Sequence, residues 1–181
     1  MTAPTTALAP ETTDVHIRPL RRGDVAGLQA LHQRLSRDTI YRRYLSARVP
    51  SIAELEQITR LNENGGGALA VVHEGTIIGA GYYVRNGERS AEPALLIEDR
   101  YQRHGIGARL ASELGQHALA RGINTFVASI YPENRAVMRL IRASGLAYES
   151  VLAHGIREVR MCLEQIASVV NPARAAATAT C

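Results

Sequence analysis

The sequence predicts an α+β fold in which helices cover a mixed central sheet. Segments with alternating or continuous apolar residues, which are typical of strands, occur near both ends of the chain and in its middle. Stretches with apolar residues at helical spacing lie between them. The turn sequences Glu74-Gly75 and Asn86-Gly87 indicate that some neighbouring strands pair as hairpins. Because other strands alternate with helices, the sheet is expected to be mixed.

One strand and three helical stretches are expected first. The strand covers 16–20, and Asp24 would then cap a helix with one apolar face. A second helical stretch, 38–45, follows directly. The third begins at Pro50-Ser51, because Ser51 and Glu54 have the spacing of a capping box.

The rest of the chain is expected to add further strands and two helices. Asn134 would cap the second of these helices, and Gly145 would end it. In chain order the elements are strands 68–73, 76–84 and 92–98, a helix at 105–122, a strand at 125–131, a helix from Asn134 to Gly145, and strands 148–153 and 158–163.

The chain is expected to contain one folded domain. Residues 1–14 consist largely of Thr, Ala and Pro without periodicity and read as a flexible segment, and residues 169–181 form a low-complexity tail. The length of 181 residues suits a single compact domain with its own core. We assign this domain to residues 15–168.

Composition excludes several classes of protein and of mechanism. Hydrophobic residues make up 46% of the chain and charged residues 21%, which is ordinary for a globular protein and argues against disorder throughout. All 21 basic residues are arginine, so no mechanism that needs a lysine of this chain is possible. Cys162 and Cys181 are too few for a thiolate cluster, and the six histidines lack metal-ligand spacing, so no metal is expected.

Neither a nucleic acid nor a membrane is expected as a partner. The formal net charge of +4 is modest, and no recognition helix or RNA-binding signature is present. No apolar run approaches the length of a membrane span, and residues 1–14 lack the basic and apolar regions of a signal peptide. A cytoplasmic protein is therefore expected.

The most informative segment is the one in which the strand at 92–98 runs through a short loop into the next helix. There the sequence Gln102-x-x-Gly105-x-Gly107-Ala108 places small residues at the helix start. Small residues allow a ligand to approach the backbone, and the unpaired amides of a first helical turn favour an anion. The segment lacks the lysine of a phosphate-binding loop and the third glycine of a dinucleotide site. It indicates a pyrophosphate site, or else a helix that packs tightly through its glycines.

This segment resembles motif A of the Gcn5-related N-acetyltransferase (GNAT) family, whose signature is Gln/Arg-x-x-Gly-x-Gly/Ala after the fourth strand. The order of elements from His16 to Leu163 is also similar to that family, and Asn134 falls where the family has an asparagine after the fifth strand. The stretch Leu35-Ser-Arg-Asp-Thr-Ile-Tyr-Arg-Arg-Tyr44, followed by Ala53-Glu-Leu55, resembles the bacterial Pat-type protein lysine acetyltransferases. The resemblance implies the GNAT fold, a mostly antiparallel sheet of about seven strands that is splayed between strands four and five.

The resemblance also implies acetyl-CoA as the co-substrate. The backbone of the fourth strand, at Leu95, Leu96 and Ile97, would pair with pantetheine. Asn134 would reach the pantetheine or the thioester region, and it would also suit a plain helix cap. The loop and the first helical turn would hold the pyrophosphate, with a charge added by arginine. These residues are Gln102, Arg103, His104, Gly105, Ile106, Gly107 and Ala108.

Glu92 is the expected catalytic base. It stands in an Ala-Glu-x-Ala setting at the start of the fourth strand, which matches the Pat-type glutamate. A lysine amine, with an ordinary pKa of about 10.4, arrives protonated and must lose a proton before it attacks a thioester. Burial beside the apolar strand would make this carboxylate a stronger base. Glu98 and Asp99 are close in sequence, although they follow the strand end.

One position departs from the family pattern. Many members have a tyrosine seven residues after the motif asparagine, as a general acid for the leaving thiolate, and Ile141 stands there instead. A thiol with a pKa of about 8.5 is a tolerable leaving group without a dedicated acid. Tyr131 is an aromatic alternative, although a core or rim position would explain it more simply.

Five arginines lie between residues 34 and 48, with Asp38 as the only acid among them: Arg34, Arg37, Arg42, Arg43 and Arg48. The first helices of the GNAT fold flank the acceptor. A cationic rim there would repel polyamines and aminoglycosides and would favour an acidic protein surface. The same arginines would also suit a solvated helix face.

The sequence therefore predicts an acetyl-CoA-dependent N-acetyltransferase. Its acceptor would be a lysine of a protein with an acidic surface, such as an acyl-CoA synthetase, which attacks directly in a ternary complex. One alternative is a small-molecule amine or antibiotic N-acetyltransferase. Another is a non-catalytic acyl-CoA-binding regulatory module.

Overall fold

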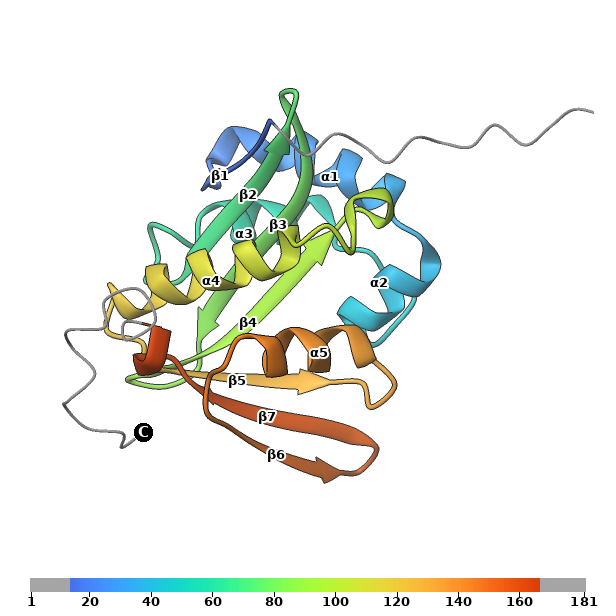
Figure 1. Cartoon of the computed structure of the whole chain (residues 1–181). Helices are drawn as coiled ribbons and strands as arrows, with labels where there is room; N and C mark the ends of the chain where they lie inside the picture. Colours follow the sequence, from blue (N-terminus) through green and yellow to red (C-terminus); the bar gives the residue numbers. More distant parts are fainter. Residues whose placement is uncertain (1–13, 167–181) are drawn as a thin grey trace, which may run out of the picture.

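The computed structural model describes residues 14–166, which form the predicted α+β fold (Figure 1). A single sheet has the strand order β1-β2-β3-β4-β5-β7-β6. Its strands are β1 (Val15–Pro19), β2 (Gly67–His73), β3 (Thr76–Arg85), β4 (Ser90–Ile97), β5 (Thr125–Ile130), β6 (Tyr148–Ala153) and β7 (Ile156–Cys162). The helices are α1 (Val25–Arg34), α2 (Arg37–Tyr44), α3 (Ile52–Thr59), α4 (Ile106–Leu119) and α5 (Arg135–Ala143), with short 3-10 helices η1 (Arg22–Asp24) and η2 (Asp99–Tyr101).

The sheet is splayed between β4 and β5, as the resemblance implies. These two strands run parallel, whereas all other neighbouring strands are antiparallel. β4 pairs with β3 from Ala91 to Ile97. It pairs with β5 only at Ser90 and Ala91, which lie opposite Thr125 and Phe126. Beyond that point β4 and β5 diverge (Figure 1).

Helices cover both faces of the sheet and form a core on each. α4 and α5 lie on one face, and Leu110 of α4 is at the centre of a large core there. α1 and α3 lie on the other face, with a second core around Leu28. Along β4 the two faces alternate, so that Leu95 belongs to the first core and Leu96 to the second.

Two predicted helix caps are confirmed. Ser51 and Glu54 form the capping box of α3, in which the side chain of each accepts a hydrogen bond from the amide of the other. Asn134 caps α5, since its Oδ1 accepts a hydrogen bond from the amide of Val137 at 3.3 Å. Such short-range caps depend on neighbours in the sequence, so the sequence alone predicts them well.

The predicted cap of α1 is wrong. Asp24 precedes α1, but its carboxylate makes no capping hydrogen bond to that helix. It binds the guanidinium of Arg18 at 2.7 and 2.8 Å and accepts a hydrogen bond from the amide of Arg21 at 2.8 Å. Asp24 therefore ties η1 to β1, two elements that meet only in the folded chain.

The terminal segments predicted at 1–14 and 169–181 lie outside the described residues, except for Asp14. Within 14–166, every helix is too short or too polar to cross a bilayer. Strand boundaries differ slightly from the prediction, since β4 begins at Ser90 and β7 at Ile156.

Candidate active site

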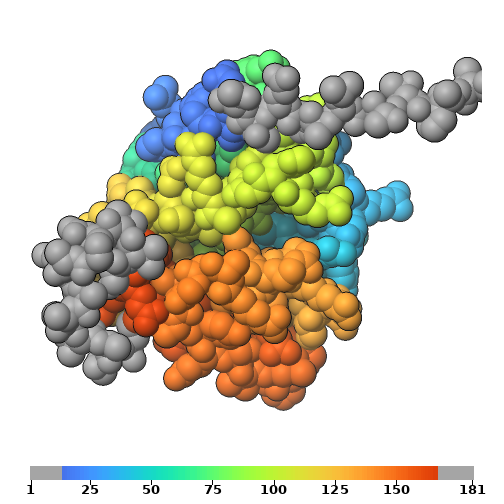
Figure 2. All heavy atoms as spheres, in the orientation of Figure 1, coloured from blue at the N-terminus to red at the C-terminus, as the bar shows by residue number. Residues whose placement is uncertain are grey.

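β4 has an open edge toward β5 for most of its length. Leu95, Leu96 and Ile97 pair with β3 on one side, and no described strand pairs with them on the other. Peptide groups on such an edge are available to a ligand that carries amides of its own. α4 and α5 flank the opening, and the surface is indented between them (Figure 2).

The loop after β4 has the geometry of an anion site. Arg103 and Gly105 both adopt left-handed backbone angles, with φ of 66° and 79°. Within the described part of the chain, the amides of residues 103–108 donate to no acceptor. Unpaired amides at the start of α4, a helix of 14 residues, favour a negatively charged ligand.

The residues predicted to hold the pyrophosphate contribute in different ways. The side chains of Arg103, His104 and Ala108 are exposed, whereas Ile106 is buried and offers only its amide. A Cβ placed on Gly107 would meet no atom within 4 Å, so a ligand has room to approach the backbone there.

Gln102 has its side-chain donors engaged inside the protein. Its Nε2 donates to the carbonyl of Ile97 at 2.9 Å and to Oγ1 of Thr39 at 3.3 Å. Its backbone amide donates to the carbonyl of Asp99 at 3.2 Å. These bonds suit a residue that holds the loop against β4 and α2.

Glu98 and Asp99 are both committed to structural contacts. Glu98 is buried and pairs with Nε of Arg34 at 2.8 Å and with Nε of Arg100 at 2.6 Å. Asp99 holds Ser36, the N-cap residue of α2, since it accepts hydrogen bonds from the amide and hydroxyl of Ser36 at 2.9 and 2.7 Å, and from Oγ1 of Thr39 at 2.7 Å. Burial acts to raise the pKa of Asp99, but these hydrogen bonds outweigh it and lower that pKa.

Glu92 lies at the closed end of the opening between β4 and β5, one residue after the last pair between these strands. Its side chain is exposed, so the burial that the sequence predicts for it is wrong. Glu92 pairs with Val84 of β3. Because directly paired residues share a face, and Tyr82 two residues away packs against the second core, Glu92 lies on the side of α1 and α3.

Three further predicted positions lie around the far side of the opening. Asn134 is buried, and its Oδ1 is used as the cap of α5. Ile141 is buried in the core under α5. The ring of Tyr131, just after β5, contacts the ring of Tyr41 in α2 edge to face, with centroids 5.7 Å apart. The charge of Glu133 raises the pKa of Tyr131, which makes this tyrosine a weaker acid.

An open strand edge beside the unpaired amides of a helix start indicates a ligand site. A match to a known family can show which kind of protein has this arrangement. The sequence model of the acetyltransferase (GNAT) family matches residues 29–146, from α1 to the end of α5. The chain belongs to the GNAT family. The matched part of the chain is therefore of the N-acetyltransferase type.

Individual relatives agree with this family. Acetyltransferase Pat of Mycolicibacterium smegmatis is 30% identical over 138 residues, which are 74% of this chain and 41% of that protein. The chain thus spans less than half the length of this curated relative. Two solved structures share the GNAT fold. The GNAT domain of S. lividans PAT has a TM-score of 0.74 at 22% identity and covers 81% of this chain and 89% of its own. A phosphinothricin acetyltransferase (Pat) from Sinorhizobium meliloti in complex with AcCoA has a TM-score of 0.66 at 21% identity, with 82% and 87% covered.

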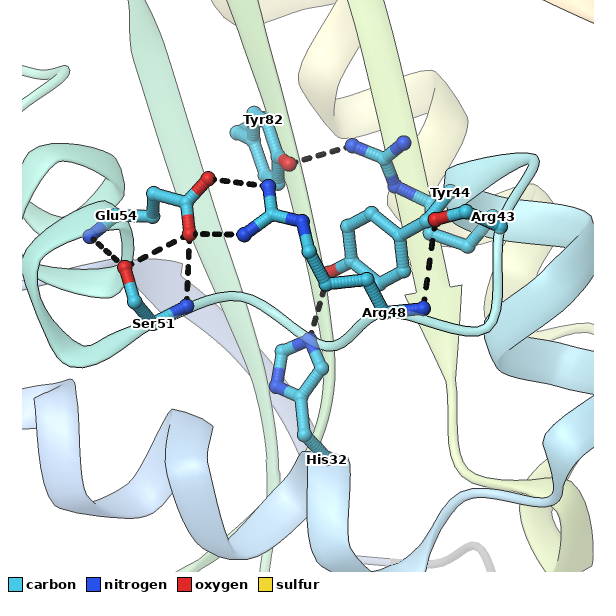
Figure 3. Close-up of polar contacts among 8 residues, drawn as sticks. His32, Arg43, Tyr44, Arg48, Ser51, Glu54 and Tyr82 are labelled. Atoms are coloured by element: carbon cyan, nitrogen blue, oxygen red, sulfur yellow. Dashed lines mark hydrogen bonds and ion pairs between the residues drawn. The ribbon is translucent and has the colours of Figure 1, made fainter.

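On β3, the neighbour of β4, lies a cavity of about 410 Å³ that the sequence did not reveal. It is formed by the end of α2, the loop to α3, α3 itself and β3. Its polar lining includes Arg43, Tyr44, Arg48, Glu54 and Tyr82 (Figure 3). Arg43 was expected as part of a cationic rim, but its contact with Tyr82 of β3 could not be predicted because it depends on the fold.

A buried pair supports the wall of this cavity. Nδ1 of His32 lies 2.7 Å from the carbonyl of Leu28, and Nε2 lies 2.6 Å from the hydroxyl of Tyr44 (Figure 3). Burial lowers the pKa of His32 and raises the pKa of Tyr44. Both groups are therefore neutral near neutral pH, with His32 donating to Leu28 and Tyr44 donating to His32. The pair fixes the end of α2 against α1.

The predicted cationic rim is largely neutralised. Arg34, Arg42 and Arg48 all form ion pairs with carboxylates. Two of the partners, Glu98 and Glu54, come from outside the segment 34–48, so the sequence count of a single opposing acid was misleading. Among the described residues, Arg37 and Arg43 have no acidic partner.

Exposed apolar side chains are concentrated on the elements that form this cavity. Most of the large apolar residues that the described chain exposes lie on α2, on the loop to α3, at the start of α3 or on β3: Tyr41, Leu45, Val49, Ile52 and Val84. The others, Tyr148, Val151 and Leu152, lie on β6. A cluster of exposed apolar side chains is typical of a surface that contacts another macromolecule.

Proposed function

We propose that this chain transfers the acetyl group of acetyl-CoA to the side-chain amine of a lysine in a protein substrate, by direct attack within a ternary complex. One observation carries the choice of a protein acceptor: the exposed apolar side chains lie mostly on the elements that form the cavity, and one of them, Val84, lines the cavity and pairs with Glu92. A protein buries such side chains when it docks, whereas a small polar amine would leave them exposed to water. The relative at 30% identity is named acetyltransferase Pat, which agrees with the resemblance of the sequence to the Pat-type branch of the family.

The residues of the cofactor edge fit acetyl-CoA. The unpaired amides of residues 103–108, the open space at Gly107 and the charge of Arg103 suit a pyrophosphate. The open edge of β4 at Leu95, Leu96 and Ile97 suits the amide groups of pantetheine. Asn134 borders the same opening, and its side-chain amide group would donate to this part of the ligand. When bound, acetyl-CoA supplies the thioester carbonyl that an amine attacks and the thiolate that leaves.

Glu92 acts as the base in this proposal. Its exposed carboxylate accepts one proton from the lysine ammonium, directly or through a water, and so gives the nitrogen its lone pair. The carbon–nitrogen bond of the acetamide then forms as the carbon–sulfur bond breaks, and the second amine proton passes to solvent, from which the leaving thiolate can be protonated. Ile141 cannot donate a proton to the thiolate, which agrees with a leaving group whose pKa is only about 8.5.

The acceptor we favour is an acidic protein, with an acyl-CoA synthetase as the first to be tried. Arg37 and Arg43, which lack acidic partners in the described chain, would attract such a surface. Long-range attraction of this kind raises the rate of encounter and weakens with salt.

Release of the coenzyme thiol tests this proposal. The purified enzyme and acetyl-CoA would be given an acyl-CoA synthetase, spermine or an aminoglycoside in parallel reactions. We expect thiol release with the protein, accompanied by acetyl-lysine in it. Release with spermine or the aminoglycoside alone would instead favour a small-molecule enzyme. Tight acetyl-CoA binding without release from any acceptor would favour a regulatory module.

A further inference from the structure

We propose that the cavity beside Glu92 binds a carboxylate of the acceptor, and that Arg43 is the residue that holds it. This inference rests on the proposed transfer to protein lysine. It adds a rule for the choice of lysine, which is that an acidic residue lies a few positions away from the acetylated one.

Arg43 lines the cavity, and its positive charge has no acidic partner among the described residues. Its guanidinium lies over the rings of Tyr44 and Tyr82, at 4.8 and 5.2 Å from their centroids, and one of its terminal nitrogens donates to the hydroxyl of Tyr82 (Figure 3). Its Nε is buried and has no hydrogen-bond partner in the described part of the chain. A buried donor without an acceptor is costly, so an acceptor supplied by a ligand would be stabilising there.

The other charged groups of the cavity cancel one another. Both terminal nitrogens of Arg48 bind the carboxylate of Glu54, at 2.8 and 2.6 Å. Glu54 is further held by Ser51, whose amide and hydroxyl each donate to it at 2.8 Å. His32, behind Tyr44, is held neutral by its burial. The lining of the cavity therefore has one net positive charge, that of Arg43.

A single carboxylate is the ligand group that matches this setting. A guanidinium presents Nε and a terminal nitrogen as a planar fork, which fits the two oxygens of a carboxylate. One positive charge balances one negative charge, whereas a phosphate would bring an excess of negative charge into a partly apolar cavity. The apolar side chains at the rim, such as Leu45 and Val49, would exclude water from the pair.

The position of the cavity sets the spacing in the acceptor. Tyr82, which Arg43 touches, pairs with Ala94 of β4, and Val84 of the cavity lining pairs with Glu92. Paired strands lie about 5 Å apart and two residues along a strand span about 7 Å, so the Cα atoms of Tyr82 and Glu92 lie about 8 Å apart. An extended peptide advances about 3.3 Å per residue. The acidic residue is thus expected within about three positions of the lysine.

Synthetic peptides test this rule. Each peptide would have blocked ends and one lysine, with glutamate moved through about three positions on either side, and a partner peptide with glutamine at the same place. The wild-type enzyme is expected to acetylate the best glutamate peptide about tenfold more efficiently, in kcat/KM, than its glutamine partner. Arg43→Gln is expected to reduce this ratio to about one.

Arg42→Gln is the matched control. Arg42 is the next residue of α2, does not line the cavity and is already paired with Asp38 at 2.8 Å. This variant should keep the preference of the wild type for glutamate. A melting temperature for each variant would show whether Arg43→Gln still folds. The comparison of glutamate with glutamine peptides needs only the wild type and so tests the inference in any case.

The possible outcomes separate this inference from the proposed function. Equal acetylation of glutamate and glutamine peptides by the wild type would overturn the carboxylate rule and leave lysine transfer intact. A preference that survives Arg43→Gln would overturn the role of Arg43. Free glutamate, tested in parallel, supplies the same carboxylate from a small molecule. Acetylation of free glutamate without any peptide would overturn the protein acceptor and support a carboxylate site.

Discussion

Among the three acidic residues of β4 and the turn after it, Glu92 has the only carboxylate that forms no hydrogen bond or ion pair within the described residues. Glu98 is held by two arginines, and Asp99 by Ser36 and Thr39 of α2. A carboxylate whose oxygens are engaged in such contacts is not free to receive an incoming amine. The structure thus removes the two rivals that the sequence left open, and Glu92 remains the proposed base.

Replacing Glu92 by glutamine should remove the base and preserve the shape of the side chain. We expect kcat to fall by about 10²- to 10³-fold, because general base catalysis contributes about that much, while the dissociation constant of acetyl-CoA stays within about twofold. Steady-state kinetics and a binding titration would measure the two effects. Glu88→Gln is the control, since Glu88 is exposed in the turn before β4. An unchanged kcat in Glu92→Gln would contradict the assignment.

Replacing Gly107 by glutamate should abolish acetyl-CoA binding without unfolding the protein. The new side chain meets no protein atom near its Cβ, and a carboxylate in the first turn of α4 suits the helix dipole. It would, however, bring negative charge and bulk to the place proposed for the pyrophosphate. Calorimetric titration and thermal melting would show the two results. Gly23→Glu is the control, because a Cβ on Gly23 also meets open space. Normal acetyl-CoA binding by Gly107→Glu would contradict the proposed cradle.

At the residue scale the sequence predicts those features that depend on local motifs. Gln102, Gly105 and Gly107 stand out because glycine spacing at a helix start is visible in one short segment. The role of Arg43 is not visible, because its partner Tyr82 follows 39 positions later. The exposure of Glu92 could not be predicted either, because it depends on how the sheet splays.

Among the helices, α2 links the cavity to the loop before α4. Its N-cap residue Ser36 is bound by Asp99, and Thr39 also accepts a hydrogen bond from Gln102. Its C-terminus is held by the pair of Tyr44 and His32. Movement at either end would therefore reach both the loop and the cavity.

Asp99→Ala should loosen this link. The change removes three hydrogen bonds, two from Ser36 and one from Thr39, and we expect the free energy of unfolding to fall by about 1–2 kcal/mol. The dissociation constant of acetyl-CoA should rise several-fold, because the loop loses its support. Urea denaturation and a binding titration would check both effects. Asp38→Ala is the control on the same helix: its surface ion pair with Arg42 should contribute less than about 0.5 kcal/mol. Equal stability of the two variants would contradict the role of Asp99.

His32 should make the stability of the protein depend on pH. Its pKa in the folded protein lies below the ordinary value of 6.5, mainly because of burial and further because of the charge of Arg43. The unfolded chain therefore binds more protons between the two values, and stability is complete above pH 6.5 and falls as the pH drops toward the folded pKa.

Urea denaturation at a series of pH values would measure this effect. Below pH 6.5 the free energy of unfolding of the wild type should fall by up to about 1.4 kcal/mol per pH unit more than that of His32→Gln. Parallel curves for the two proteins would show that His32 does not titrate in this range.

Elements are predictable from sequence where their signals are local, and less so where a distant residue intervenes. The capping box of Ser51 and Glu54 needs only four consecutive residues, and the prediction was confirmed. Asp24 looks like a cap for α1, but Arg18 of β1 binds its carboxylate more strongly than a helix amide would. The short helices η1 and η2 were missed, because single turns have no periodicity to detect.

At the scale of the whole molecule, the open sheet is what creates the site. β4 and β5 pair at one end only, so the open edge of β4 runs from Glu92 to the loop before α4. The number of strands could be predicted from the apolar patterns. The position of β7 between β5 and β6 could not, because the order in which strands pair depends on segments that are distant in the sequence. The predicted splay came from the family resemblance rather than from the strands themselves.

The absence of lysine makes the acceptor easy to identify. Acetyl-lysine found after a reaction with this chain must belong to another molecule, because none of its 181 residues can carry it. A cell extract incubated with the purified enzyme and isotope-labelled acetyl-CoA can therefore be read by mass spectrometry without a background from self-acetylation. We expect labelled lysines in proteins with acidic surfaces, and their loss with Glu92→Gln. Label confined to small amines, or labelled lysines that are equally abundant with Glu92→Gln, would contradict transfer to protein lysine through Glu92.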